Sequence, residues 1–464
     1  MTPKPEQIIA TSDAPRWGNG LTVVCLLVAI TAAALVLRIS YLHQTKIRSP
    51  IMKDAEQYRN YGWHLWQNGV FSSSEPYQTP VADSFRAPGY PLLIAAAFWA
   101  GGGRDYYAIV LHIQAVLGTL MVPMTFLLGR TFLPRWYALG AAGLVALSPH
   151  LVSMSSYMLT ETLFGFLLLA AMLILVYGVR RRSVTMLAGA GACFGATFLV
   201  NQTAGMLPLL FAGGLFLGRR IVGIRPDRRM TGGLALLVLI FLLFPLAWMA
   251  HDRLVLAPDA KRGSDRLLAT MTHGTYPDFM FWDPRYRNYP YRDDPESAVY
   301  RSSFGNFTRI FWSRFRHRPG RYLTWYLIQK PYILWTWNIL QGEGDVYVYG
   351  VVYSLYDRNT LALLTHRLMK WSHPLVLGLT LVAFILYARQ TLRSLRTNHP
   401  WGRSPDLLLL TLAAYTLFYT LVTPWPRYAV PLRPELYLCA VWGLYALTTR
   451  TILRLPDKMA TNPV

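Results

Sequence analysis

The chain has 464 residues, of which 53% are hydrophobic and only 15% are charged, and its mean hydropathy is +0.28. An ordinary soluble domain is less apolar and more charged, so this composition excludes one and predicts a polytopic membrane protein. Repeated apolar stretches of about 20 residues are long enough to cross a bilayer as helices, with every backbone group hydrogen-bonded inside the segment.

The net charge of +22 arises from 45 Lys and Arg residues against 23 Asp and Glu residues. Short basic clusters between the apolar stretches fit positive-inside anchoring. A second basic group lies in the aromatic-rich segment 251–373 and favours an anionic ligand, because no nucleic-acid-binding motif is present. The cysteines Cys25, Cys193 and Cys439 lie far apart in apolar stretches, so they predict neither a disulfide framework nor a metal site.

Segment length and loop charge together predict roughly ten membrane spans with both termini in the cytoplasm. The first apolar stretch, Leu21–Leu42, is too long for the hydrophobic region of a cleaved signal, and we interpret it as an uncleaved anchor, with a cleaved signal as the alternative. The expected division is a cytoplasmic tail at 1–20, seven transmembrane helices in 21–250 with a catalytic outer loop at 43–106, a large outer loop at 251–373, three further helices in 374–450, and a second tail at 451–464.

Two shorter segments are expected to lie at the membrane surface. The run GYPLLIAAAFWA within the first outer loop is too short to span and predicts an interfacial or re-entrant helix. Residues 321–340 predict an amphipathic helix along the interface, where Trp and Tyr side chains are preferred. If this segment spans instead, every later helix changes direction.

The segment from Lys53 to Pro91 has the composition of a functional loop, because it is long and has no helical apolar stripe of its own. If its start is helical, Asp54, Tyr58 and Tyr61 share one face by their spacing. A single carboxylate among aromatic side chains suits a general base. The alternative is a solvated acid that caps a short helix.

Charged residues elsewhere are expected at the same outer side of the membrane. Glu161 begins the fourth expected span, either as a second site residue or as a partner of the helix dipole. Arg86 and Arg427 lie at expected outer membrane edges beside prolines and tyrosines, and Lys330 is a further candidate in the expected interfacial helix. The planar guanidinium group of arginine suits a phosphate, and snorkelling to the interface is the alternative role for these cations.

Four short motifs, taken in this order and on one side of the membrane, resemble the GT-C-fold glycosyltransferases that use polyprenyl-phosphate sugars. That group includes the protein O-mannosyltransferases and the aminoarabinose transferase of lipid A. The motifs are Asp54 and Tyr58 in a D-x-x-x-Y pattern, RAPGYP from Arg86, Glu161 at a helix start, and the RYxxP pattern of Arg427, Tyr428 and Pro431.

The resemblance implies an all-α GT-C-like bundle of about ten transmembrane helices, with interfacial helices in the outer loops and an active site on the periplasmic face of the inner membrane. A sugar would pass from undecaprenyl phosphate or a related polyprenyl phosphate to an acceptor hydroxyl, usually with inversion. Asp54 would orient or deprotonate the acceptor, and Arg86, Lys330 and Arg427 would hold the donor phosphate. The tyrosines implied in the donor or sugar pocket are Tyr58, Tyr61, Tyr90 and Tyr428.

The expected partners are a polyprenyl-phosphate sugar, a lipid, glycan or protein acceptor, and membrane lipids, without nucleic acid. No tightly bound cofactor is expected. No metal is predicted either, because Glu161 stands where some relatives carry aspartate. The alternative function is a transporter or flippase for a polyprenyl-linked or anionic lipid. A transporter should place ionisable groups near the midplane, often in repeated halves, whereas most ionisable groups here are expected at one face.

Overall fold

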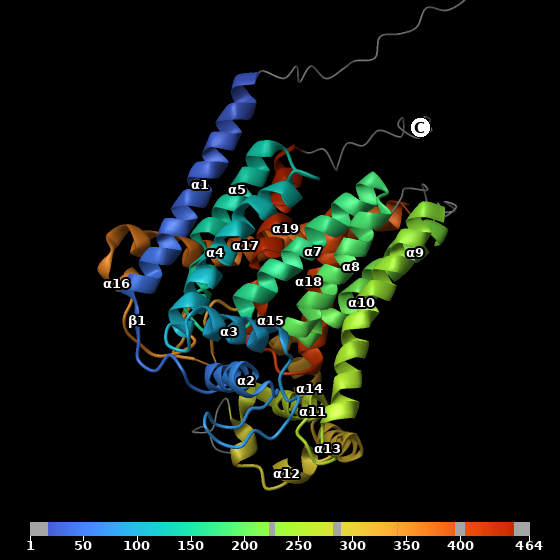
Figure 1. The fold of residues 1–464 in the computed structure, drawn as a ribbon. Coiled ribbons are helices and arrows are strands. Elements are labelled where there is room, and N and C mark those ends of the chain that lie inside the picture. Colours follow the sequence, from blue (N-terminus) through green and yellow to red (C-terminus); the bar gives the residue numbers. More distant parts are fainter. Residues whose placement is uncertain (1–16, 222–227, 282–288, 341, 395–403, 450–464) are drawn as a thin grey trace, which may run out of the picture.

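The computed structural model describes residues 17–221, 228–281, 289–340, 342–394 and 404–449, and these residues form helices with a single two-stranded sheet. Figure 1 shows two parts: long helices stand side by side, and short helices gather at one of their ends, away from the start of α1. We call the group of short helices the outer layer.

Five helices of the described residues are long and apolar enough to cross a membrane. Hydrogen bonds along each helix satisfy its backbone groups within the segment, except in the turns that precede the internal prolines Pro123, Pro245 and Pro374. They are α1 (Trp17–Gln44), α4 (Tyr106–Gly129), α7 (Glu161–Arg181), α10 (Arg228–Val255) and α17 (Thr360–Ser394). The predicted class, an all-α polytopic membrane protein, is confirmed, while the number of about ten spans stays a prediction.

Shorter helices pack beside these five and complete the bundle. Gly191 of α8 lies directly against the backbone of Leu237 in α10, where a Cβ atom would not fit, so small residues allow these two helices to approach closely. The remaining bundle helices are α5 (Arg135–Leu147), α6 (Pro149–Met154), α8 (Val184–Val200), α9 (Met206–Ile221), α18 (Ser404–Leu421) and α19 (Arg433–Thr449).

The outer layer is built from the two long segments between membrane helices (Figure 1). Its elements are α2 (Asp54–Asn68), α3 (Gly89–Ala100), α11 (Gly263–Gly274), α12 (Ser297–Tyr300), α13 (Phe304–His317), α14 (Pro319–Thr324), a π-helical turn (Trp325–Gln329) and α15 (Lys330–Leu334). Helix α3 has 12 residues and a length of about 18 Å, which is too short to cross the hydrocarbon core.

Helix α2 forms in a segment without an apolar stripe because its buried face is aromatic and polar. Tyr58, Tyr61 and His64 are buried at helical spacing. The His64 ring nitrogens lie 3.0 Å from Asn68 Oδ1 and 3.1 Å from the carbonyl of Ser74. Hydrogen bonds to the following loop therefore stabilise the buried face of α2, as apolar contacts do in an ordinary amphipathic helix.

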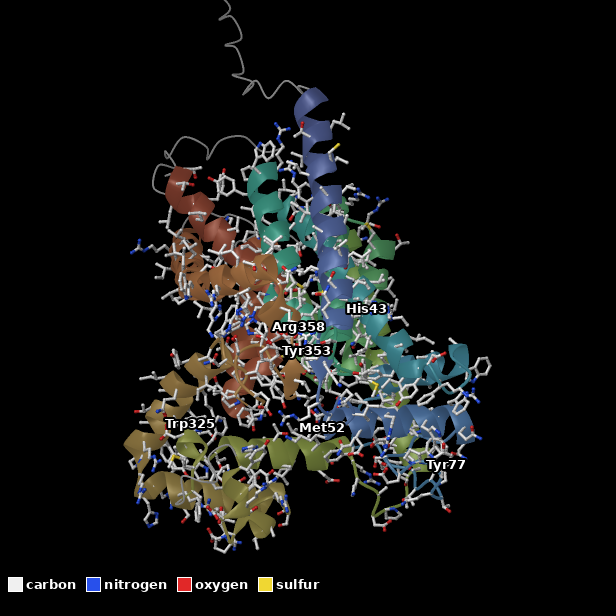
Figure 2. All side chains as sticks on the ribbon, turned by 90° about the vertical axis from the view of Figure 1, so that its left-hand side faces the viewer. His43, Met52, Tyr77, Trp325, Tyr353 and Arg358 are labelled. Atoms are coloured by element: carbon white, nitrogen blue, oxygen red, sulfur yellow. The ribbon has the colours of Figure 1, made fainter. Side chains whose placement is uncertain are left out.

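The start of α2 is fixed by contacts with a distant part of the chain. Strand β1 (Lys46–Ile47) pairs antiparallel with β2 (Val351–Tyr353), which precedes α16 (Leu355–Arg358). The Tyr349 hydroxyl donates to the carbonyl of Met52 at 3.1 Å. Figure 2 shows Met52 between the bundle and the outer layer. These contacts hold the residues just before α2 in place.

Lys53 has φ 51° and ψ −116°, a backbone conformation suited to glycine, and its side chain is exposed. Such strain costs about 1–3 kcal/mol, so Lys53→Gly is expected to stabilise the fold by about 1 kcal/mol. The measurement is the melting temperature of the purified protein in detergent. Lys53→Ala keeps the Cβ atom and serves as the control, and a glycine variant no more stable than the alanine variant would contradict the strain.

Two helix boundaries and one segment differ from the expected ones. Helix α10 continues to Val255, and α17 begins at Thr360 rather than Pro374. Residues 319–334 form α14, the π-helical turn and α15, and the Trp325 indole donates to the carbonyl of Gly274 at 2.8 Å. Trp325 therefore anchors this segment to α11 (Figure 2). Of the expected tails, 451–464 and 1–16 lie outside the described residues, and 17–20 belong to α1.

Candidate active site

Four charged side chains from four separated parts of the chain meet where the outer layer contacts the bundle. Asp54 Oδ1 lies 2.7 Å from Arg86 Nη2, and Asp54 Oδ2 lies 2.7 Å from Arg427 Nη2. Glu161 Oε1 lies 2.9 Å from Nε of the same Arg427. Asp54 keeps 26% of its side-chain surface exposed, while the other three keep 6–7%. We call these four residues the charge cluster.

Each residue of the charge cluster lies at or near the start of a helix. Asp54 and Glu161 are the first residues of α2 and α7, where the helix dipole favours a carboxylate. Arg86 precedes α3, whose Gly89 lies so close to Leu199 that an added Cβ would be 2.8 Å from its carbonyl oxygen. Arg427 lies in the 3₁₀ helix 426–432, which connects α18 to α19.

Asp54 stays ionised despite its surroundings. Burial alone would raise the pKa of its carboxyl group, but the charges of Arg86 and Arg427 outweigh this and hold the pKa below its ordinary value. Arg86 also donates to Gln57 Oε1 at 2.8 Å and stands 5.1 Å from the centre of the Tyr58 ring. In this arrangement Asp54 is an ionised carboxylate that accepts hydrogen bonds from both arginines and is a weak base.

Two cavities open on the charge cluster, and Asp54, Arg266 and Tyr428 line both of them. The smaller cavity, of about 20 Å³, lies on the bundle side and includes Glu161 and Arg427 together with Leu159, Thr160, Phe164, Asn201 and Pro431. The larger cavity, of about 330 Å³, lies on the outer-layer side and includes Arg86 together with Gln57, Phe85, Thr272, His273, Tyr291, Ser297, Arg301 and Trp425. Asp54 is therefore accessible from two directions.

The structure brings together six of the nine residues that the sequence analysis proposed for the site, namely Asp54, Glu161, Arg86, Arg427, Tyr58 and Tyr428. It does not bring Lys330 into the charge cluster. The Lys330 ammonium group is buried and donates to the carbonyls of Thr420 at 2.7 Å and Val422 at 2.9 Å, at the end of α18. In this position Lys330 satisfies the last carbonyls of a helix.

Two of the proposed tyrosines also lie outside both cavities. Tyr61 is buried, its hydroxyl donates to the carboxylate of Asp83, and its ring stacks on Phe71 at 4.2 Å. Tyr90 is buried and donates to Gln114 Oε1 at 2.8 Å. Tyr61 therefore anchors the loop that precedes Arg86, and Tyr90 supports the ring of Tyr58, whose centre lies 5.2 Å away.

Sequence reasoning missed Arg266, which reaches both cavities from α11 and contributes to the low pKa of Asp54. It lies in the stretch GSDRLLATMTHG, where one arginine resembles any exposed helix residue. The mixture of apolar and charged residues could have predicted a helix, but no signal in the stretch relates it to Asp54. Asn201, at the end of α8, was also missed as a cavity residue.

The charges around the cavities favour an anion. Arg86, Arg266 and Arg427 surround two carboxyl groups, so at least one positive charge remains uncompensated. A phosphate near Asp54 could receive bidentate hydrogen bonds from guanidinium groups. The site therefore combines an anion-binding wall with one accessible carboxylate.

Residues 86–248 match the family model of dolichyl-phosphate-mannose-protein mannosyltransferases. The matched part covers less than half of the chain and includes RAPGYP and Glu161, two of the motifs on which the resemblance rested. The resemblance to glycosyltransferases of this type is thereby confirmed. A comparison with curated proteins finds no match.

Two solved structures illustrate what the chain is similar to. One is the archaeal oligosaccharyltransferase AglB from Archaeoglobus fulgidus, in complex with an inhibitory peptide and a dolichol-phosphate, at 12% identity and a TM-score of 0.49, with 97% of this chain and 53% of that chain covered. The other is ArnT from Cupriavidus metallidurans bound to undecaprenyl phosphate, at 14% identity and a TM-score of 0.35, with 93% and 81% covered. The present chain spans about half the length of the oligosaccharyltransferase.

Proposed function

We propose that this protein is a membrane glycosyltransferase that moves a sugar from a polyprenyl-phosphate donor to an acceptor hydroxyl, with inversion at the anomeric carbon. The observation that carries the proposal is Asp54, a carboxylate held by two arginines at the junction of two cavities. The family match over residues 86–248 supports it.

The donor phosphate would bind on the side of the smaller cavity. Arg427 and Arg266 line it there, beside the apolar side chains of Leu159 and Phe164 near the start of α7. This combination suits a phosphate joined to an apolar chain. The guanidinium groups would also stabilise the negative charge that develops on the phosphate as the bond to the sugar breaks.

Donor binding would also activate Asp54. When the donor phosphate attracts Arg86 and Arg427, the carboxylate loses two cationic partners and becomes a stronger base. The acceptor oxygen then attacks the anomeric carbon, its proton passes to Asp54, and the polyprenyl phosphate leaves with the bonding electrons. A single displacement of this kind inverts the configuration.

We also propose that the site faces the periplasm and that the protein resides in the bacterial inner membrane. In support, α7 begins at the charge cluster with Glu161 and ends at the other side of the bundle with Arg180 and Arg181. Positive residues favour the cytoplasmic side. Both the donor and the acceptor would therefore be reached from outside the cytoplasm.

We propose that transfer needs no divalent metal, because the guanidinium groups already supply the positive charge that a metal would bring to the donor phosphate. Asp54 and Glu161 are both paired with arginine. Incubation with EDTA, followed by its removal, is expected to leave the rate of sugar transfer unchanged. A loss of transfer that Mg²⁺ or Mn²⁺ restores would contradict this expectation.

The test of the proposed function is sugar transfer by the purified protein from a panel of synthetic short-chain polyprenyl-phosphate sugars. Release of polyprenyl phosphate and loss of labelled sugar from the donor report the reaction together. Turnover with one donor class would support the proposal and identify the sugar. Tight binding of the lipid without turnover of any donor would favour the alternative of a lipid flippase.

A further inference from the structure

The larger cavity has polar groups that the charge cluster does not use. Arg266 and Arg301 line it, and neither side chain has an ion-pair partner among the described residues. Thr272 also lines this cavity and is 2% exposed, and its buried hydroxyl has no hydrogen-bond partner in the described part of the chain. A buried polar group of this kind costs free energy unless a ligand or water satisfies it.

Aromatic side chains form another part of the wall. The rings of Tyr291 and Trp425 both pack edge-to-face with His273, with ring centres 5.2 Å and 5.4 Å from the imidazole. Phe85 and Tyr428 are the other aromatic residues among the described residues that line the cavity. Flat aromatic faces with hydroxyl groups between them suit a sugar ring, which presents both C–H faces and hydroxyl edges.

Most of the charged residues that line the larger cavity are positive. Among the described residues that line the cavity, the one carboxylate is Asp54, which is already paired with Arg86 and Arg427. Arg266 and Arg301 thus leave a positive field in a cavity of about 330 Å³, a volume at the lower end of the range for small-ligand sites. An anionic group would be attracted there, whereas a cationic one would be repelled.

On the basis of the proposed function, we propose that this cavity is the acceptor site and that its acceptor is a saccharide carrying a phosphate or carboxylate group. The sugar ring lies against the aromatic wall, and Arg301, which lines only this cavity, holds the anionic group. This places the acceptor hydroxyl next to Asp54, on the side opposite the donor phosphate. Arg301 then determines which acceptor is used.

A binding experiment tests the acceptor class without requiring turnover. The protein in detergent is first saturated with citronellyl phosphate, so that the donor side is occupied, and is then titrated with methyl α-D-glucopyranoside 6-phosphate or with unphosphorylated methyl α-D-glucopyranoside. The phosphorylated probe is expected to bind about tenfold more tightly. Arg301→Gln should remove this preference, and Arg301→Lys should retain part of it.

The matched control is Arg309→Gln, because Arg309 is an exposed arginine of α13 that bonds to Asn306 and does not line the cavity. The Arg309→Gln variant should prefer the phosphorylated probe to the same extent as the unchanged protein. Equal binding of both probes, or an unaltered preference in Arg301→Gln, would overturn the proposal, as would tighter binding of an uncharged serine-containing peptide. A different result separates this proposal from the proposed function. If no donor supports sugar transfer but the protein still prefers the phosphorylated probe, the glycosyltransferase function and the acceptor role are rejected, and the cavity remains an anion-binding site.

Discussion

Replacing Asp54 by asparagine is expected to lower the rate of sugar transfer by about 10²–10⁴-fold, the usual contribution of general-base catalysis. The carboxylate is the one group that both cavities share and that can accept the proton of the acceptor hydroxyl. The same substitution removes a negative charge from between Arg86 and Arg427. Binding of citronellyl phosphate should therefore be unchanged or tighter. A variant that had lost its fold would instead lose this binding.

The control for this variant is Glu56→Gln, which removes another carboxylate from the first turn of the same helix. Glu56 is half exposed and lies 3.9 Å from Arg59, away from the charge cluster. Its rate of transfer should stay within about twofold of the unchanged protein, because exposed ion pairs contribute little. Full turnover by Asp54→Asn would show that another group accepts the proton, and weak lipid binding by it would indicate a structural role instead.

The helical class of the protein follows from composition, because a membrane-spanning segment needs a long apolar stretch that is visible without any tertiary information. The two acidic residues of the charge cluster could also be predicted from the sequence, since Asp54 and Glu161 each begin a helix next to an expected membrane edge. In both cases the informative signal is local. It depends on one segment and the side of the membrane on which that segment ends.

The rest of the site depends on contacts between segments, which local patterns do not contain. Lys330 has the chemistry of a phosphate ligand, but its helix turns it toward the carbonyls at the end of α18. Tyr61 shares a helix face with Tyr58, yet the loop that follows α2 brings Asp83 to its hydroxyl. Arg266 reaches Asp54 only because α11 lies beneath the bundle, which no periodicity predicts.

Replacing Arg427 by alanine is expected to have the second large effect, because this guanidinium group bridges Asp54 and Glu161. Glu161 is 6% exposed and would be left as an unpaired buried acid. Removal of one partner from a buried ion pair typically costs about 3–5 kcal/mol. The variant should therefore melt at a lower temperature and should also lose affinity for citronellyl phosphate.

The two effects can be separated with a second substitution. Arg427→Ala combined with Glu161→Gln removes both charges of the buried pair, so most of the lost thermal stability should return, while Asp54 keeps Arg86 as its partner. Sugar transfer and lipid binding should not return, because the guanidinium group that would hold the donor phosphate is still absent. If the double variant regains transfer together with stability, Arg427 serves only to neutralise Glu161, and the donor phosphate must be bound by Arg86 and Arg266 alone.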